Sequence, residues 1–280
     1  MKKPKIGFMQ GRLLPQTSHE IQSFPGTEWE KEFEKASKIG FEVMEWIFDD
    51  HGKNPLLTDE GVDEIKSFSK KFDISINSVC ADYFMEKKLF GESEDKLKNN
   101  VKVLSNLITQ SKKLGISFIE IPLVDSSSLI TDNNKLEFKK NIDEMLPLAK
   151  NNGITIVLET DLNPIDFRNY LLEFDHSNIK ANYDSGNSAS LGYNVEEELD
   201  ILKDWIANVH IKDRKLHGGT VPLGSGDTNF EQFFSSLFKI NYTNDLIIQG
   251  ARIVNNEEMP ENTCKSYLKF VKEYVDRYYT

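Results

Sequence analysis

Four polar side chains in the second half of the chain each follow an apolar, strand-like run: Glu159, Asp184, His210 and Gln249. The intervals between them are comparable with the roughly 30 residues of one βα unit in a closed (β/α)8 barrel. If the four runs are successive barrel strands, these side chains converge at the carboxyl ends of the strands. Two carboxylates, an imidazole and an amide oxygen form a donor set for one divalent ion: Mn²⁺, Mg²⁺, Co²⁺ or Zn²⁺.

Each of these residues also has a simpler interpretation. Glu159 could be a solvated or salt-bridged carboxylate, and Asp184, which precedes Ser-Gly-Asn, could form a turn. His210 could be a hydrogen-bonded core histidine, and Gln249 could be structural. The metal-site hypothesis rests on all four occurring together at matching strand ends, rather than on any one of them.

The elements that must position these residues alternate along the chain. We expect eight strands, at 5–9, 41–47, 74–80, 117–121, 154–159, 180–184, 206–211 and 245–249. Amphipathic helical stretches are expected between and after them, near 27–39, 60–72, 93–114, 134–151, 165–174, 196–203, 229–239 and 259–278. Gly40, Gly115 and Gly153 stand just before strands, where helix C-caps belong. No linker divides the chain, so one α/β barrel domain over 1–280 is predicted; a doubly wound open sheet is the competing topology.

Composition narrows the class of protein. The 280-residue chain carries a formal net charge of −11 with a pI of about 5.1, the wrong sign for extended nucleic-acid binding. No apolar run approaches the roughly 20 residues that span a bilayer, and no signal-peptide core is present, so we expect a cytoplasmic protein without membrane association. Cys80 and Cys264 fit no metal-ligand spacing, and a disulfide framework is not expected.

Several segments together resemble the xylose isomerase-like TIM barrels, which include sugar and sugar-phosphate isomerases and ketose 3-epimerases. The resemblance is carried by Ile6-Gly7-Phe8-Met9-Gln10-Gly11-Arg12-Leu13, Cys80-Ala81-Asp82-Tyr83-Phe84, Leu158-Glu159-Thr160, Tyr183-Asp184-Ser185-Gly186-Asn187, Val209-His210-Ile211-Lys212-Asp213-Arg214 and Pro222-Leu223-Gly224-Ser225-Gly226-Asp227. It implies a divalent metal held by Glu159, Asp184, His210 and Gln249. Singly these motifs are weak, and together they identify the family better than the substrate.

Gln249 departs from the pattern of the resembling epimerases, whose last ligand is usually Glu. In those enzymes two glutamates on opposite faces of the sugar remove and return a proton. An amide oxygen can bind a metal but cannot take up a proton at neutral pH. An isomerisation through an enediol needs only one base and is compatible with Gln249, with Glu159 as the catalytic base and acid.

Cations and polar groups near other strand ends are candidates for holding the substrate. An arginine binds phosphate or carboxylate with a bidentate fork, so an anionic sugar is expected despite the net negative charge. We assign to substrate binding Gln10, Arg12, Glu45, Lys212, Arg214 and Arg252. Surface salt bridges are the alternative for the cations, and Gln10 with Arg12 could instead lock the start of the barrel. We place Asp213 beside His210 as a candidate acceptor for its second ring nitrogen, and Asp227 or Thr228 near the N-cap of the next helix.

The sequence therefore predicts a divalent-metal-dependent isomerase or epimerase that acts on a small sugar or sugar phosphate through an enediolate. The resembling scaffold also supports dehydration of inositol-type polyols and isomerisation of hydroxypyruvate, and its members often form dimers or tetramers. Two alternatives stay open. One is a carbohydrate-binding or sensing barrel without catalysis, because Gln249 could mark the loss of an acid or base. The other is an endonuclease IV-like phosphodiesterase, against which the 5 histidines and the acidic charge argue.

Overall fold

The structure, a computed structural model, describes residues 2–15, 22–49, 54–252 and 259–279. Within these ranges eight parallel strands form one closed barrel, paired in chain order, with β8 returning to β1. The strands are β1 Ile6–Met9, β2 Val43–Ile47, β3 Ser75–Cys80, β4 Phe118–Leu123, β5 Thr155–Thr160, β6 Ile179–Asp184, β7 Ile206–Ile211 and β8 Leu246–Ile248. The predicted barrel is confirmed, and the open-sheet alternative is wrong because β1 and β8 pair with each other.

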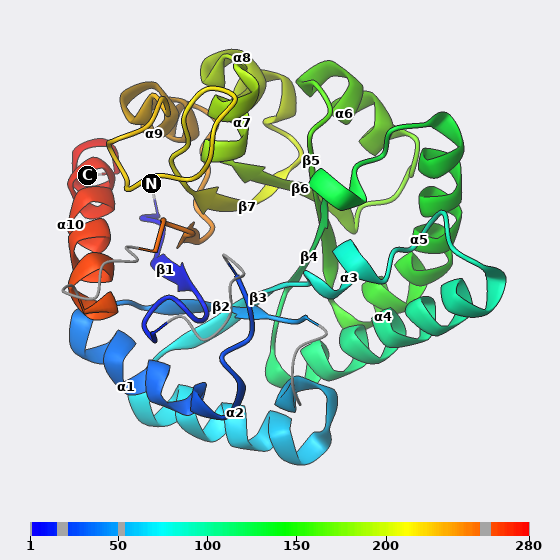
Figure 1. Cartoon of the computed structure of the whole chain (residues 1–280), viewed down its shortest axis with the longest axis horizontal. Helices are drawn as coiled ribbons and strands as arrows, with labels where there is room; N and C mark the ends of the chain where they lie inside the picture. The colour runs from blue at the N-terminus through cyan, green and yellow to red at the C-terminus, as the bar shows by residue number, and fades with distance from the viewer. Residues whose placement is uncertain (1, 16–21, 50–53, 253–258, 280) are drawn as a thin grey trace.

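Helices surround the barrel and cover the outer faces of its strands (Figure 1). They are α1 Glu30–Ile39, α2 Asp59–Phe72, α3 Tyr83–Glu86, α4 Glu94–Leu114, α5 Asp132–Asn152, α6 Pro164–Leu172, α7 Ser185–Leu191, α8 Val195–Leu202, α9 Phe230–Lys239 and α10 Pro260–Tyr278. Short 3₁₀ turns occur at Gly26–Glu28, Pro55–Leu57 and Asp125–Ser127. Helix α10 contacts both α9 and α1, so the two ends of the chain close the ring (Figure 1).

Three glycines end helices as predicted. Gly40, Gly115 and Gly153 have φ values of 98°, 85° and 71°, the left-handed conformation that a residue without Cβ adopts at little cost. Each glycine ends its helix a few residues before the next strand begins. These caps fix where β2, β4 and β5 start, which is why the strand prediction is accurate there.

One helix was not predicted. No helix was expected between residues 184 and 196, but Ser185–Leu191 forms the short helix α7, whose N-cap is Asp184. The N-cap of α9 is Asn229, whose side chain accepts from the Gln232 amide, so Asp227 and Thr228 lie next to the cap, as expected. Helix α7 was missed because serine and glycine have low helix propensity, which the cap and the tertiary contacts override.

The strands of the barrel carry buried polar side chains in their middle and near their carboxyl ends. Those with at most 3% exposure include Glu45, Glu120, Asn182, Asn208 and His210. Burying a charged or polar group is costly unless it is hydrogen-bonded, so these side chains indicate a functional site. No helix in the described ranges is both long enough and apolar enough to cross a membrane.

Candidate metal and substrate site

The structure brings Glu159, Asp184 and His210 together at the ends of three neighbouring strands, β5, β6 and β7. One potential ligand atom from each residue lies within 4.8 Å of those of the other two. All three side chains are buried. This convergence is the one expected from the spacing of the apolar runs.

His210 is held between carboxylates on both ring nitrogens. Nε2 lies 2.6 Å from Oε1 of Glu45, and Nδ1 lies 3.3 Å from Oε2 of Glu159. Burial alone would lower the pKa of His210, but the charges and hydrogen bonds of Glu45 and Glu159 raise it well above its ordinary value. In the neutral tautomer with the proton on Nε2, the Nδ1 lone pair accepts from Nδ2 of Asn182 at 3.1 Å and faces Glu159, so a metal that binds Nδ1 would replace that hydrogen bond.

Glu45 is therefore the acceptor for the second ring nitrogen of His210, and the expectation that Asp213 would have this role is wrong. Asp213 instead accepts hydrogen bonds from the backbone amides of Gly224, Gly226 and Thr228, at 2.8, 2.8 and 3.1 Å. It shapes the loop before α9. Glu45 is fully buried and also accepts from Nδ2 of Asn208 at 2.8 Å.

Two asparagines hold the carboxylate of Glu159. Asn182 donates to Oε2 at 2.6 Å, and Asn187 donates to Oε1 at 2.5 Å. Burial would raise the pKa of Glu159, but the hydrogen bond and charge of His210 outweigh it and lower that pKa. Glu159 is thus held as a carboxylate, the form that accepts a proton or binds a cation.

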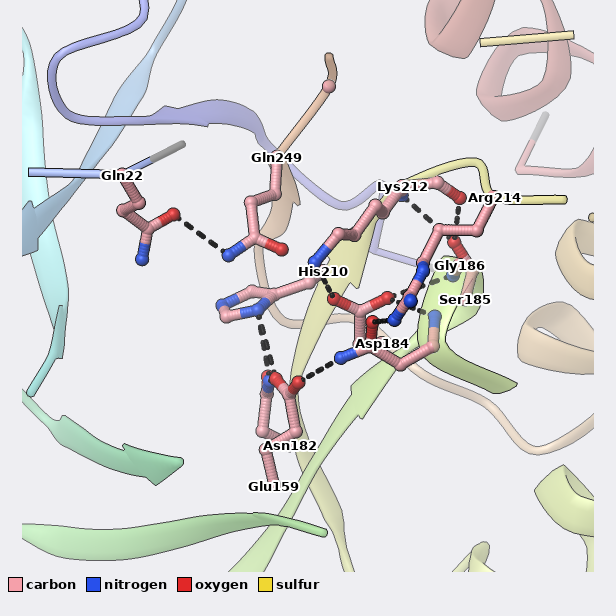
Figure 2. Close-up of polar contacts among 12 residues, drawn as sticks. Gln22, Glu159, Asn182, Asp184, Ser185, Gly186, His210, Lys212, Arg214 and Gln249 are labelled. Atoms are coloured by element: carbon pink, nitrogen blue, oxygen red, sulfur yellow. Dashed lines mark hydrogen bonds and ion pairs between the residues drawn. The ribbon is translucent and has the colours of Figure 1, made fainter. Parts of the chain in front are cut away.

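The two carboxylate oxygens of Asp184 have different partners. Oδ1 accepts from the backbone amides of Gly186 and Asn187, both at 2.8 Å, and so caps α7. Oδ2 lies 3.4 Å from Nζ of Lys212 (Figure 2). Burial raises the pKa of Asp184, which Lys212 partly opposes. The turn-forming interpretation and the ligand interpretation are therefore compatible, because each uses a different oxygen.

Gln249 continues the β7–β8 pairing, with its backbone amide donating to the carbonyl of Ile211 at 2.9 Å. Its Nε2 donates to Oε1 of Gln22 at 2.9 Å, and its Oε1 lies on the side facing His210 and Lys212 (Figure 2). That oxygen is buried and has no hydrogen-bond partner among the described residues. A buried acceptor left in this way fits a cation, and together with Glu159, Asp184 and His210 it would make an oxygen and nitrogen donor set for Mn²⁺, Mg²⁺, Co²⁺ or Zn²⁺.

A cavity of about 870 Å³ includes Glu159 and Gln249 in its wall, whereas Asp184 and His210 are not among its lining residues. Arg12, Lys212 and Arg214, three of the residues assigned to the substrate, also line it. The other three are not among its lining residues: Gln10, Glu45 and Arg252. Gln10 accepts from the Ile47 amide at 3.0 Å, and Arg252 donates to the Leu14 carbonyl at 3.1 Å, so both stabilise the barrel near β1.

Several residues of the site were not assigned a role from the sequence. Asn182 occurs two residues before Asp184 on the same face of β6, so the two-residue period of a strand could have identified it. Asp82, which follows β3, and Glu120, in the middle of β4, also line the cavity. Gln22 lies far from any strand, and no sequence pattern distinguishes it.

The comparisons with known proteins agree with this geometry. Residues 33–268 match the family model described as xylose isomerase-like TIM barrel, and the chain belongs to that family. SgbU of Haemophilus influenzae, provisionally named an L-ribulose-5-phosphate 3-epimerase, is 25% identical over 280 residues, covering 93% of each chain. UlaE of Salmonella heidelberg, an L-ribulose-5-phosphate 3-epimerase, is 21% identical over 254 residues, covering 86% of this chain and 88% of its own. The IolI protein, solved with a bound zinc atom, superposes with a TM-score of 0.78 at 17% identity over 98% of this chain and 99% of its own.

Proposed function

We propose that this protein is a divalent-metal-dependent isomerase or epimerase acting on a small sugar or sugar phosphate. The observation that carries the proposal is the close approach of ligand atoms from Glu159, Asp184 and His210, within 4.8 Å of one another, where Glu159 also lines the cavity. The names of the curated relatives support a sugar substrate. Manganese is our first choice of ion, because two carboxylates, an amide oxygen and one imidazole suit a hard to borderline metal.

A bound metal would polarise two oxygens of the sugar and lower the energy of an enediolate. The chain's own part is the proton transfer. Glu159, ionised and fixed by Asn182 and Asn187, takes the proton from the carbon beside the carbonyl and can return it to the neighbouring carbon. Asp184, His210 and Gln249 act as ligands, and Glu45 keeps the imidazole oriented.

The cations at the cavity favour a substrate with an anionic group. Arg214 donates to the Gly218 carbonyl and to Oδ1 of Asn187, at 2.9 and 2.8 Å. These acceptors are neutral, and among the described residues Arg214 forms no salt bridge with a carboxylate. A phosphate near Arg214, Lys212 and Arg12 would supply that counter-charge.

Two measurements test the proposal. The first is calorimetric titration of Mn²⁺ into the wild type and into Asp184→Asn, in which Asn can still cap α7 through its oxygen. We expect one site per chain and at least about 10-fold weaker binding in the variant, since it loses a charged ligand. Wild type without a site, or a variant that binds equally well, would contradict the metal assignment.

The second measurement is proton exchange in deuterated water, followed by NMR, with L-ribulose 5-phosphate, unphosphorylated L-ribulose and a panel of other ketoses and their phosphates. We expect deuterium incorporation by the Mn²⁺-loaded wild type and none by Glu159→Gln. A stronger response to phosphorylated sugars would support the assignment of Arg214. Saturable sugar binding without any exchange would instead favour the non-catalytic, sensing alternative.

A further inference from the structure

Inversion at a carbon needs more than the single base identified above. An epimerase removes a proton from one face of the substrate and delivers a proton to the other face of the same carbon. Glu159 can serve one face. Gln249, at the end of β8, has no proton to give and cannot take one up at neutral pH. If the chain inverts a stereocentre, a second acid must come from another part of the cavity.

Asp82 lies one side chain away from Gln249. Nε2 of Gln22 donates to Oδ2 of Asp82 at 2.6 Å, and Oε1 of Gln22 accepts from Nε2 of Gln249 at 2.9 Å. Arg12 donates to the same Gln22 oxygen at 3.2 Å. This network connects the loop after β3 with the end of β8. Asp82 also lines the cavity that includes Glu159, so a sugar bound there can lie between the two carboxyl groups.

The environment of Asp82 suits proton transfer near neutral pH. Burial raises its pKa to about 6, against the hydrogen bonds from Gln22 and from the Cys80 thiol, which lower it. The side chain is nonetheless partly exposed at the cavity, so it can exchange its proton with water there. A general acid works best when its pKa is close to the working pH.

Glu120 is the competing candidate, since both its carboxyl oxygens are buried and lack a hydrogen-bond partner among the described residues. Its place in the barrel is less suitable. It lies on β4, paired directly with β5, which carries Glu159, and the residue is fully buried. Glu120 is therefore on the strand next to the first base, whereas Asp82 follows β3, one strand further away, and is linked to Gln249 through Gln22.

We propose that Asp82 is the second acid and base of this site and takes over the role that a carboxylate at position 249 would have. This inference rests on the proposed function. Glu159 takes the proton from the carbon beside the carbonyl, and the C–H electron pair forms the carbon–carbon double bond of the enediolate. Protonated Asp82 then gives its proton to the opposite face of that carbon, the carbonyl re-forms, and the configuration is inverted. Glu159 loses its proton to water and Asp82 regains one, so no oxidant or reductant is needed.

The test compares two readouts for Asp82→Asn, using the Mn²⁺-loaded full chain and whichever ketose of the panel the wild type exchanges fastest. Formation of the epimer should fall by at least about 100-fold, the usual contribution of a general acid. Deuterium incorporation into the starting sugar should persist within about fivefold, because Glu159 can still remove and return a proton on its own face. Glu86→Gln is the matched control, an exposed carboxylate in α3 at the same cavity, and should keep both rates.

The double variant Asp82→Asn/Gln249→Glu should recover epimer formation at least about 10-fold over Asp82→Asn, since it puts a carboxylate back at the end of β8. The inference is overturned if Asp82→Asn keeps inverting at the wild-type rate, if it loses exchange and inversion equally, or if Glu120→Gln shows the split instead. Wild-type exchange without inversion also overturns it, because no second acid is then required. Wild type that exchanges no sugar of the panel overturns the proposed function as well, so the two failures are distinguishable.

Discussion

Glu45 should control metal affinity without touching the metal. Its Oε1 lies 2.6 Å from Nε2 of His210, and its Oε2 accepts from Asn208 at 2.8 Å. Glu45→Gln keeps the volume of the side chain but removes its charge, and the new amide nitrogen must face either His210 or Asn208, which both donate. The hydrogen bond that holds the imidazole is charge-assisted and therefore stronger than a neutral one. Weakening it should make the free energy of Mn²⁺ binding about 1.5–3 kcal/mol less favourable.

We therefore expect Mn²⁺ to bind Glu45→Gln roughly 10- to 100-fold more weakly than the wild type, the range typical of partners behind a metal-bound histidine. Calorimetry at pH 8 measures the affinity, and urea unfolding shows how much stability the apo protein loses. Glu120→Gln is the matched control, because Glu120 is an equally buried barrel carboxyl whose oxygens have no hydrogen-bond partner, His210 included, within the described ranges. Unchanged affinity in Glu45→Gln, or an equal loss in Glu120→Gln, would refute the reasoning that the contact with the ring is what matters.

Three further predictions concern stability and are checked by urea unfolding. Asp184→Ala should unfold about 0.5–2 kcal/mol more easily than Asp184→Asn, because alanine cannot cap α7. Burial raises the pKa of Glu198 to about 7, so its folded form holds a proton more tightly than the unfolded chain. This contribution to the free energy of unfolding is complete below about pH 4.5 and is lost as the pH rises through 7, roughly 3 kcal/mol in all. Glu198→Gln should make the free energy of unfolding less dependent on pH over this range. Gly226→Ala would place a Cβ 2.0 Å from Oδ1 of Asp213 and should cost about 1–3 kcal/mol by displacing the loop; a neutral effect would show that the loop adapts.

The sequence predicts the barrel well because its signals are local. An apolar run that begins shortly after a helix-ending glycine, as at Gly115 and Gly153, defines a strand without knowledge of any distant residue. The strand ends then place Glu159, Asp184 and His210 correctly, since all parallel strands of a barrel end at the same rim. Hydrophobic periodicity and strand direction are therefore sufficient to predict the barrel and the position of these three residues.

The contacts inside the barrel are not local, and the sequence-based predictions fail there. Glu45 meets His210 across the barrel interior although 165 positions separate them in the chain. Asp213, which is near His210 in sequence, belongs to the loop beyond the strand and turns toward Gly224 and Gly226. Which inward side chains meet depends on how the strands are staggered around the barrel, and that property comes from the closed sheet as a whole.

Gln249 shows how one such contact decides the chemistry of the site. An isolated glutamine could present either its oxygen or its nitrogen to the cavity, and only the oxygen can bind a cation. Here Nε2 of Gln249 donates to Oε1 of Gln22, whose own nitrogen donates to Asp82. Arg12 can only donate, and it donates to the same Gln22 oxygen, so the orientation of the Gln22 amide is fixed; Gln22 in turn directs the oxygen of Gln249 toward the proposed metal ligands. The network that orients the Gln249 amide thus ends in a carboxyl group, a side chain that can carry the proton that Gln249 cannot.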